Sequence, residues 1–212
     1  MNLRNFLQTA RVVKPAKLPN LEQQALDANT PSDRLAELAT LSVKLAQSVA
    51  LNPNASSELL RALSLSEDDL TRKNVATNPN TPTEVLLELG GEFPEQLFSN
   101  PVFSLLFLEN PGLFYQMPID TLLAILQHEK VPLFVLELAV IQRSSHIKYE
   151  VAKNRNTPQE LLHKLAQCGG GISYAVAENP NASIQTLKAL ANNPNQVVRV
   201  LAETNLKNRH FL

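Results

Sequence analysis

The sequence predicts an all-α solenoid, a row of short two-helix repeats, from three observations. A sixteen-residue pattern recurs at near-constant spacing, most copies open a helix with similar residues, and most copies close another helix at an asparagine. The pattern is clearest in VATNPNTPTEVLLELG, which begins at Val75. A unit this short cannot bury its apolar face alone, so neighbouring copies must cover one another.

The spacing of the copies sets the size of the solenoid. Four further copies begin at Gln24, Val49, Val151 and Val176, and neighbouring copies lie 25 or 26 residues apart. The gap from 75 to 151 is close to three such steps and holds a weaker copy from Ile125, and a last copy begins at Leu201. We therefore expect about eight repeats in one domain over 21–212, with residues 1–20 and the tail after Thr204 acting as caps.

The first helix of each repeat has a marked start. Thr81 is placed to accept hydrogen bonds from the first turn, Pro82 stands at the first helical position, and Glu84 reaches back to complete a capping box. Thr157 and Pro158 repeat the arrangement. Two copies lack Thr-Pro and keep a serine one residue later, at Ser56 and Ser183.

An apolar stripe follows this start. Val85, Leu86 and Leu89 lie at i, i+1 and i+4, which places them on one face of a helix of about two and a half turns. Such a helix is too short to be stable alone in water. The stripe therefore predicts burial against neighbouring repeats.

A second short helix precedes the asparagines, because Ile147, Val151 and Ala152 lie at i, i+4 and i+5. The same set is predicted in the last repeat at Val197, Leu201 and Ala202. This helix ends where an asparagine tolerates the left-handed conformation and a following proline prevents continuation. The repeated asparagines are Asn52, Asn78, Asn154 and Asn179. We expect their side chains to bond backbone groups at the turn; the alternative is a ladder that binds a ligand.

The pattern V-A-x-N-P-N-T-P-x-x-L-L-x-x-L-A resembles the leucine-rich repeat variant, over about 24–89 and 125–204. The resemblance implies a right-handed superhelix of α-helices alternating with short or 3₁₀ helices, without β-sheet. It implies no enzymatic activity. Some relatives hold an iron–sulfur centre through a cysteine cluster, whereas this chain has Cys168 alone; no cofactor is therefore expected.

Composition indicates an ordinary soluble chain of 212 residues, 44% apolar, with a net charge of −1. The longest apolar region is interrupted by charges and prolines, so no transmembrane helix is expected. The first residues lack the apolar core of a signal peptide. With a single cysteine, these features predict a cytoplasmic protein.

The repeat pattern dissolves in an irregular midsection, residues 90–135, which holds seven of the eleven aromatic residues. Arg and Lys are absent from 74 to 129, where seven acids give a charge of −7. The aromatics either fill the core of irregular repeats or line a groove whose acidic rim attracts a basic partner. The candidate partner-binding residues here are Phe98, Phe103, Phe107, Phe114 and Tyr115.

The last third has the opposite charge, because residues 130–212 carry ten basic and five acidic side chains. Tyr149 and Tyr174 occupy corresponding places in successive repeats, and stacking would align them with Lys148, Lys153 and Arg155. Such a stripe suits an acidic peptide or a phosphate backbone. Self-association between the acidic middle and the basic last third is a further expectation.

The spacing of reactive residues gives no active site. Cys168 is followed by three glycines without the lysine and serine of a phosphate loop, and His163 has no acidic orienter at a telling spacing. The four histidines form no metal-ligand spacing. The sequence therefore predicts a non-catalytic scaffold that binds a protein partner through an extended surface, with nucleic-acid binding by the basic last third as the alternative.

Overall fold

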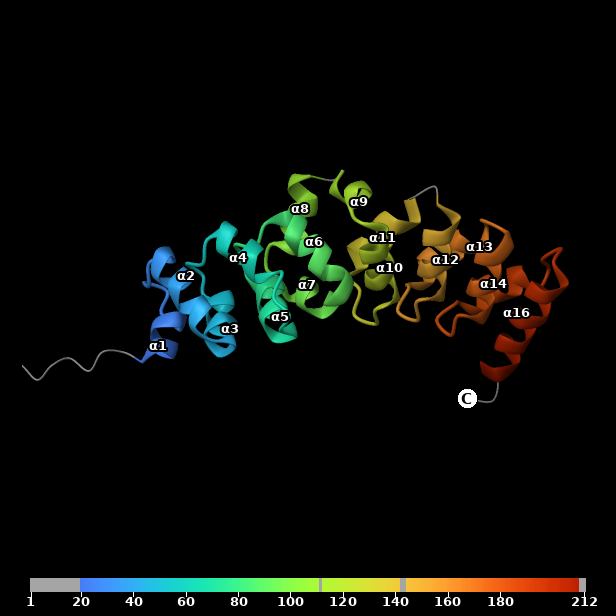
Figure 1. Cartoon of the computed structure of the whole chain (residues 1–212). Helices are drawn as coiled ribbons and strands as arrows, with labels where there is room; N and C mark the ends of the chain where they lie inside the picture. Colours follow the sequence, from blue (N-terminus) through green and yellow to red (C-terminus); the bar gives the residue numbers. More distant parts are fainter. Residues whose placement is uncertain (1–19, 111, 142–143, 210–212) are drawn as a thin grey trace, which may run out of the picture.

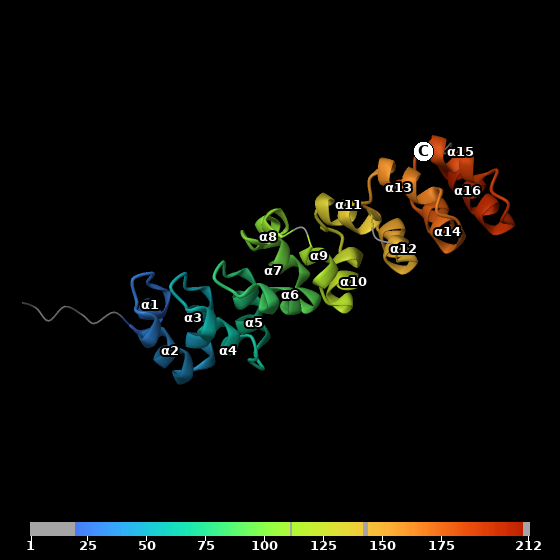
Figure 2. The same ribbon diagram turned by 90° about the horizontal axis from the view of Figure 1, so that it is seen from above.

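A computed structural model of the chain describes residues 20–110, 112–141 and 144–209. Within these ranges the structure is all-helical, with sixteen α-helices and no strand. The helices follow one another in an elongated row, with α1 and α16 at opposite ends (Figures 1 and 2). The short helices are α-helices, so of the two forms that the resemblance implied, only the short α-helix occurs in these ranges. The capping segment expected at 1–20 lies almost wholly outside them.

Two kinds of helix alternate along most of the row. Those that end at or contain the repeated asparagine, or its equivalent, are here called ladder helices. They are α1 (Leu21–Leu26), α3 (Val43–Leu51), α5 (Asp69–Thr77), α7 (Pro94–Ser99), α10 (Ile119–Gln127), α12 (Ser145–Lys153), α14 (Gly170–Glu178) and α16 (Gln196–Arg209). The intervening helices are α2 (Ser32–Leu41), α4 (Ser57–Leu63), α6 (Thr83–Glu92), α8 (Phe103–Glu109), α11 (Leu133–Ile141), α13 (Gln159–Ala166) and α15 (Ile184–Leu190). A one-turn helix, α9 (Leu113–Gln116), is extra.

The repeated asparagines join each ladder helix to the one before it. The side-chain amide of Asn78 donates to the carbonyl oxygens of Ala50 (2.8 Å) and Asn52 (2.9 Å) in the preceding repeat. The same pair of bonds, 2.7–3.1 Å long, is made by Asn52, Asn100, Asn154, Asn179 and Asn205. Both amide hydrogens are therefore used inside the protein, which is the backbone role expected for these residues.

The remaining oxygen of the asparagine side chain closes the turn. Asn78 Oδ1 accepts from the backbone N–H of Asn80 at 2.9 Å, and Asn154 Oδ1 accepts from that of Asn156 at 2.8 Å. The left-handed conformation expected here is wrong: Asn78 is extended, with φ −75° and ψ 127°, and the described non-glycine residues all have negative φ. The helix ends because the backbone of the asparagine is extended and its side-chain oxygen takes the N–H of the second residue after it. The amide of the same side chain bonds to the preceding repeat.

One position of the ladder has a histidine instead. His128 follows α10, and its Nδ1 accepts from the backbone N–H of Lys130 at 3.1 Å, as the asparagine oxygen does elsewhere. Its ring packs edge-on against Phe98, with centroids 5.5 Å apart. An aromatic contact thus stands between α7 and α10 where an amide bridge joins other ladder helices.

The helix start predicted at Thr81 and Thr157 is wrong. The hydroxyl of Thr81 donates to the carbonyl of Val75 at 2.6 Å, and that of Thr157 donates to Val151 at 2.5 Å. The helices begin two residues later, and no side chain caps them. Pro82 and Pro158 precede the first helical residue, so their carbonyls, rather than the threonine hydroxyls, accept the first intrahelical bond. The threonine ties the turn back to the ladder helix.

The serine copies do cap their helices. Ser56 accepts from the backbone N–H of Leu59 at 3.2 Å, and Ser183 accepts from that of Thr186 at 3.1 Å. At these two repeats Ala55 and Ala182 fill the buried place that threonine takes elsewhere. The threonine hydroxyl thus donates to the helix before it, whereas the serine hydroxyl accepts from the helix after it.

The last repeat is shifted by one residue from the predicted register. Val198 and Ala202 are buried, whereas Val197 is exposed and Leu201 is half-buried. Asn205 rather than Thr204 donates to the preceding repeat. Because α16 continues through this asparagine, no helix end marks the position of Asn205 in the repeat.

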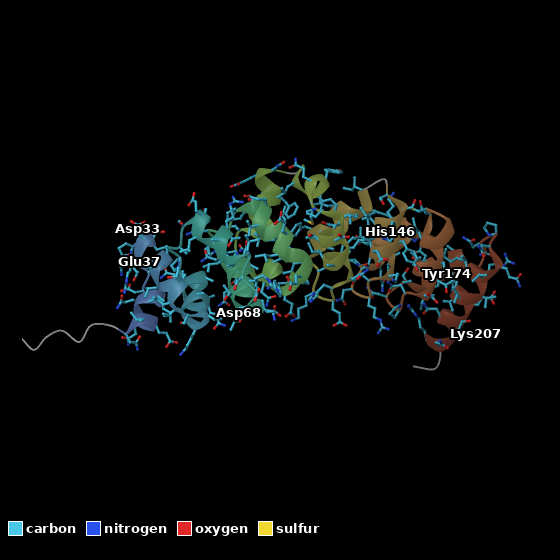
Figure 3. The ribbon with its side chains drawn as sticks, in the orientation of Figure 1. Asp33, Glu37, Asp68, His146, Tyr174 and Lys207 are labelled. Atoms are coloured by element: carbon cyan, nitrogen blue, oxygen red, sulfur yellow. The ribbon has the colours of Figure 1, made fainter. Side chains whose placement is uncertain are left out.

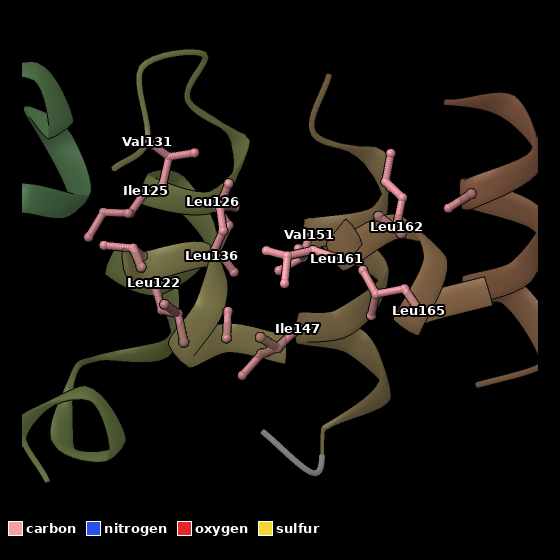
Figure 4. Close-up of a cluster of buried hydrophobic side chains, with 14 of the residues drawn as sticks. Leu122, Ile125, Leu126, Val131, Leu136, Ile147, Val151, Leu161, Leu162 and Leu165 are labelled. Carbon is pink, nitrogen blue, oxygen red and sulfur yellow. The ribbon is translucent and has the colours of Figure 1, made fainter. Parts of the chain in front are cut away.

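The apolar stripes form two cores that meet at α6. Val85, Leu89 and Phe93 pack with the cluster built from α1 to α5, while Leu86 and Leu87 pack with the cluster that runs on to α16. Figure 4 shows part of the second cluster, from Leu122 on α10 to Leu165 on α13. Helix α6 therefore packs against both cores, one on each side.

Close packing around α6 requires glycine. A Cβ atom at Gly90 would lie 2.5 Å from Leu97 Cδ2, and one at Gly91 would lie 3.1 Å from Thr121 Oγ1. Leu97 belongs to α7 and Thr121 to α10, so the paired glycines let α6 pass between these two helices. This crossing takes the place of direct stacking between α7 and α10.

Candidate interaction surface

Most of the candidate aromatic residues lie in the core. Phe103, Phe107 and Phe114 are 2%, 7% and 1% exposed. Phe103 meets Phe107 edge-on at 5.3 Å between centroids, and Phe98, half-buried, lies 6.1 Å from Phe103. These rings hold α7, α8 and α9 together, and the three buried ones present no surface to a partner.

Tyr115 is the aromatic candidate that faces outward, with 66% of its surface exposed. Exposed apolar side chains accompany it on α8 and at the start of α10: Leu105, Leu108 and Ile119. We call these four residues the midsection patch. Figure 1 shows α8 and α9 side by side at the upper edge of the row. Large apolar groups that stay exposed on consecutive helices are candidates for an interaction surface.

The acidic rim is partly neutralised by basic residues from outside the acidic window. Glu84 pairs with Arg61, Glu92 pairs with Arg72 at 2.6 Å, and Glu95 pairs with Lys130 at 2.7 Å. The first two pairs each join two helices, and the third joins α7 to the turn after α10. These contacts lower the pKa of Glu95, through its hydrogen bond with Lys130, and raise the pKa of Arg72, through its bond with Glu92. The formal charge of the window therefore overstates its negative surface.

The structure brings together part of the basic and aromatic stripe that was predicted for the last third. Tyr149 and Tyr174 lie on adjacent ladder helices, and the Lys153 ammonium stands 5.4 Å from the centre of the Tyr149 ring. Tyr174 donates to Glu178 Oε1 at 3.1 Å, which raises the pKa of the Tyr174 phenol. Figure 3 shows Tyr174 on the C-terminal part of the row.

Basic side chains of this third lack ionic partners. Lys148 and Arg155 make no hydrogen bond or ion pair through their side chains within residues 20–110, 112–141 and 144–209, and the same holds for Lys164 and Lys188. At the start of this third Lys130 pairs with Glu95, and within the described residues 144–209 the one ion pair is that of Lys153 with Glu150, 3.7 Å long. The positive charge of the last third thus remains available at the surface.

The reactive residues stay apart. His163 Nδ1 bonds to the hydroxyl of Thr186 at 3.0 Å, and the exposed Cys168 thiol lies 4.0 Å from the carbonyl of Lys164. In the part of the chain that the structure describes, no three His, Cys, Asp or Glu side chains gather as metal ligands. None of the helices described there is long and apolar enough to cross a bilayer.

Three structurally important residues could not be recognised from the repeat pattern. Asn100 and Asn205 donate across the ladder although neither stands in a clear copy of the repeat. The third is Glu150 on α12, which is 6% exposed and accepts a hydrogen bond from the side chain of Gln127 at 3.3 Å. A search for asparagine alone at intervals near 25 residues would have found the first two; nothing in the sequence marks the burial of Glu150.

Comparison with known families supports the resemblance. Residues 19–75 match the family model described as the Leucine Rich Repeat Variant domain, which confirms the resemblance over that segment. No curated protein and no solved structure matches the chain. Beyond residue 75 the asparagine bonds continue to α16, with an interruption between α7 and α10 at His128.

Proposed function

We propose that this chain, whose residues 19–75 match the Leucine Rich Repeat Variant domain model, is a non-catalytic scaffold that binds protein partners along an extended solenoid surface. In this proposal about eight repeats form one right-handed superhelix over 21–212 that acts in the cytoplasm. The scaffold needs no cofactor. Its partners are proteins, and a second copy of the chain is one of them.

The observation that carries the proposal is the midsection patch. Leu108 is 78% exposed and Tyr115 66% exposed, although the repeats on either side have buried cores of leucine and alanine. Large apolar groups left in water stabilise nothing in the monomer, whereas burying them against a partner contributes about 25 cal/mol per Å². Tyrosine is among the residues that most often dominate the binding energy of protein interfaces.

The ladder supports the same proposal. Each ladder asparagine spends both amide hydrogens on the repeat before it, so the repeats are fixed to one another without using the outer faces of the helices. A rigid support keeps exposed side chains in place before a partner arrives, which reduces the entropy lost on binding.

The test is affinity capture with the intact chain and with Leu108→Ser/Tyr115→Ser. Both side chains are exposed, so this variant should keep the thermal unfolding midpoint and lose the captured proteins. Leu65→Ser is the matched control, because Leu65 is 83% exposed on the loop after α4. Equal capture by the intact chain and the double variant would contradict the assignment of the patch.

Nucleic-acid binding is the second candidate, favoured by the unpaired Lys148 and Arg155. It predicts an affinity for RNA or DNA that falls steeply as salt rises, because binding releases counterions. A flat salt dependence of binding would remove it.

A further inference from the structure

The C-terminal third carries a groove that crosses three ladder helices. Its volume is about 660 Å³, and its walls come from α12, α14 and α16. A second hollow of about 390 Å³ adjoins it and shares Lys153 and Arg155 in its lining. The two hollows together follow the row of helices rather than a single repeat, which is the shape of a channel for an extended chain.

We infer that this channel, here called the ladder groove, binds an extended acidic peptide segment of a partner protein. The inference rests on the proposed function and names the partner chemistry for one surface of it. Packed helices lie 8–10 Å apart, so three of them span about 20 Å. An extended peptide covers that length with about six residues.

Three positive side chains line the groove, and two of them are held by contacts within the protein. Lys153 is held between the Glu150 carboxylate, 3.7 Å away, and the Tyr149 ring. Arg209 donates to Asn205 Oδ1 at 3.0 Å and to the carbonyl of Pro180. A side chain that is already held loses less conformational freedom when it binds an anion.

Arg155 is the free cation of the groove. It lies in the turn after α12, exposed, and its guanidinium has no partner among the described residues. A guanidinium binds a carboxylate through two parallel hydrogen bonds, which gives both strength and direction. Arg155 therefore supplies the strongest contact for an acidic side chain.

The floor of the groove supports side-chain recognition. Asn179 and Asn205 stand in the lining, but their amide hydrogens are already bonded to backbone carbonyls of the preceding repeat. They cannot donate to a ligand without breaking the ladder. Half-buried Leu201 adds an apolar side chain to the lining. The groove thus fits a segment in which acidic residues alternate with apolar ones.

Carboxylates along the groove disfavour a nucleic acid. Glu178 lies in the wall of the larger hollow and Glu129 in the wall of the smaller one. A phosphate backbone carries a charge at every nucleotide and would pass close to both. A peptide can place its carboxylates opposite the three cations and present neutral residues to the two glutamates.

The experiment measures the affinity of the full chain for a fluorescein-labelled peptide of about twelve residues, long enough to cross the groove, in which glutamate alternates with leucine and serine. Fluorescence anisotropy is followed at physiological ionic strength. Arg155→Glu should weaken binding roughly tenfold, equivalent to about 1.4 kcal/mol. The matched control is Lys188→Glu, which makes the same charge change on α15, outside the groove lining, and should weaken binding less than twofold. A peptide with glutamine in place of glutamate should bind at least tenfold more weakly.

Three results would overturn the inference. Equal losses in Arg155→Glu and Lys188→Glu would show attraction by net charge alone. Tighter binding of a single-stranded RNA of similar length, lost in Arg155→Glu, would assign the groove to nucleic acid. No binding of the peptide by a chain that still captures proteins through the midsection patch would exclude the groove while leaving the proposed function standing.

Discussion

The side-chain amide of Asn78 donates a 2.9 Å hydrogen bond to the main-chain carbonyl of Asn52, the equivalent residue one repeat earlier. Asn52 makes the same bond to the carbonyl of Asp27. Asn52 therefore donates to the repeat before it through its side chain and accepts from the repeat after it through its carbonyl. The bond gives the carbonyl of Asn52 a second donor beside the backbone N–H of Ala55. Equivalent side chains 22 to 26 residues apart are thereby joined in two series, which are interrupted between α7 and α10 at His128.

Removing one asparagine of the series should destabilise the protein. Asn78→Ala leaves the carbonyl of Ala50 without its side-chain donor, whereas the carbonyl of Asn52 keeps the backbone N–H of Ala55. Because a buried unsatisfied group costs about 1–3 kcal/mol, we expect a loss of about that size in the free energy of unfolding, measured by urea denaturation. Asn208→Ala, at an exposed position without such bonds, should change it by less than about 0.5 kcal/mol. Similar small losses in both variants would refute the stabilising role of the ladder.

The threonine hydroxyl that ties the turn to the ladder helix should also contribute. Thr157 is fully buried and donates to Val151 at 2.5 Å. Thr157→Val keeps the shape, removes the donor and should cost about 1–2 kcal/mol of unfolding free energy. Thr204→Val is the control, because that hydroxyl bonds the carbonyl of Val200 on an exposed part of α16. Equal effects of the two substitutions would count against the tie.

Phe103 should prove structural. Its ring is 2% exposed and packs against Phe98, Phe107 and Phe134. Phe103→Ala should cost about 3–5 kcal/mol through lost burial and a cavity. Tyr115→Ala, on the exposed side, should leave stability within about 0.5 kcal/mol. Calorimetry compares the two, and retained stability in Phe103→Ala would place that ring at the surface instead.

The ion pair between Glu95 and Lys130 gives a pH dependence. Its hydrogen bond lowers the pKa of Glu95 from the ordinary 4.5 and raises the pKa of Lys130 from the ordinary 10.5. A lowered carboxyl pKa stabilises the fold above 4.5, and the contribution is lost as pH falls through the folded value. A raised lysine pKa stabilises it below 10.5, and that contribution is lost as pH rises through the folded value.

We therefore expect Lys130→Gln to unfold at a lower temperature than the wild type between pH 5 and 10, with the difference shrinking outside that window. The pair is exposed, so the difference should be small and should decrease with salt. Thermal scans across pH test this, with Lys188→Gln as a control for net charge. A difference that stays constant down to pH 3 would rule out the pair as its source.

Regular repeats could be predicted from sequence because each local signal agreed with the next. The stripe of Val85, Leu86 and Leu89 is buried as its spacing indicates, and the turn at Asn78 ends a helix. The use of a hydroxyl could not be predicted. Thr81 can accept from the helix after it or donate to the one before it, and only the path of the backbone at Pro82 decides.

The irregular midsection shows the opposite case. The seven aromatics of residues 90–135 are compatible with a core or with a partner-binding surface, since both bury apolar area. The positions of Phe103 and Tyr115 depend on how α8 and α9 fold over α7, and no period in the sequence encodes that. The channel across α12, α14 and α16 joins residues from three repeats, so its existence depends on stacking that no single repeat contains.

Helix α6 has one flank in each apolar cluster, with Leu89 on one side and Leu86 on the other. Melting that starts at the α1 end therefore strips one flank of this helix and leaves the other covered. Amide hydrogen exchange should resolve two cooperative units with their boundary at α6. The amides of α6 should exchange with the slower rate of the more stable unit. A pulling force or a bound partner could then open half of the molecule while the remainder keeps its native form.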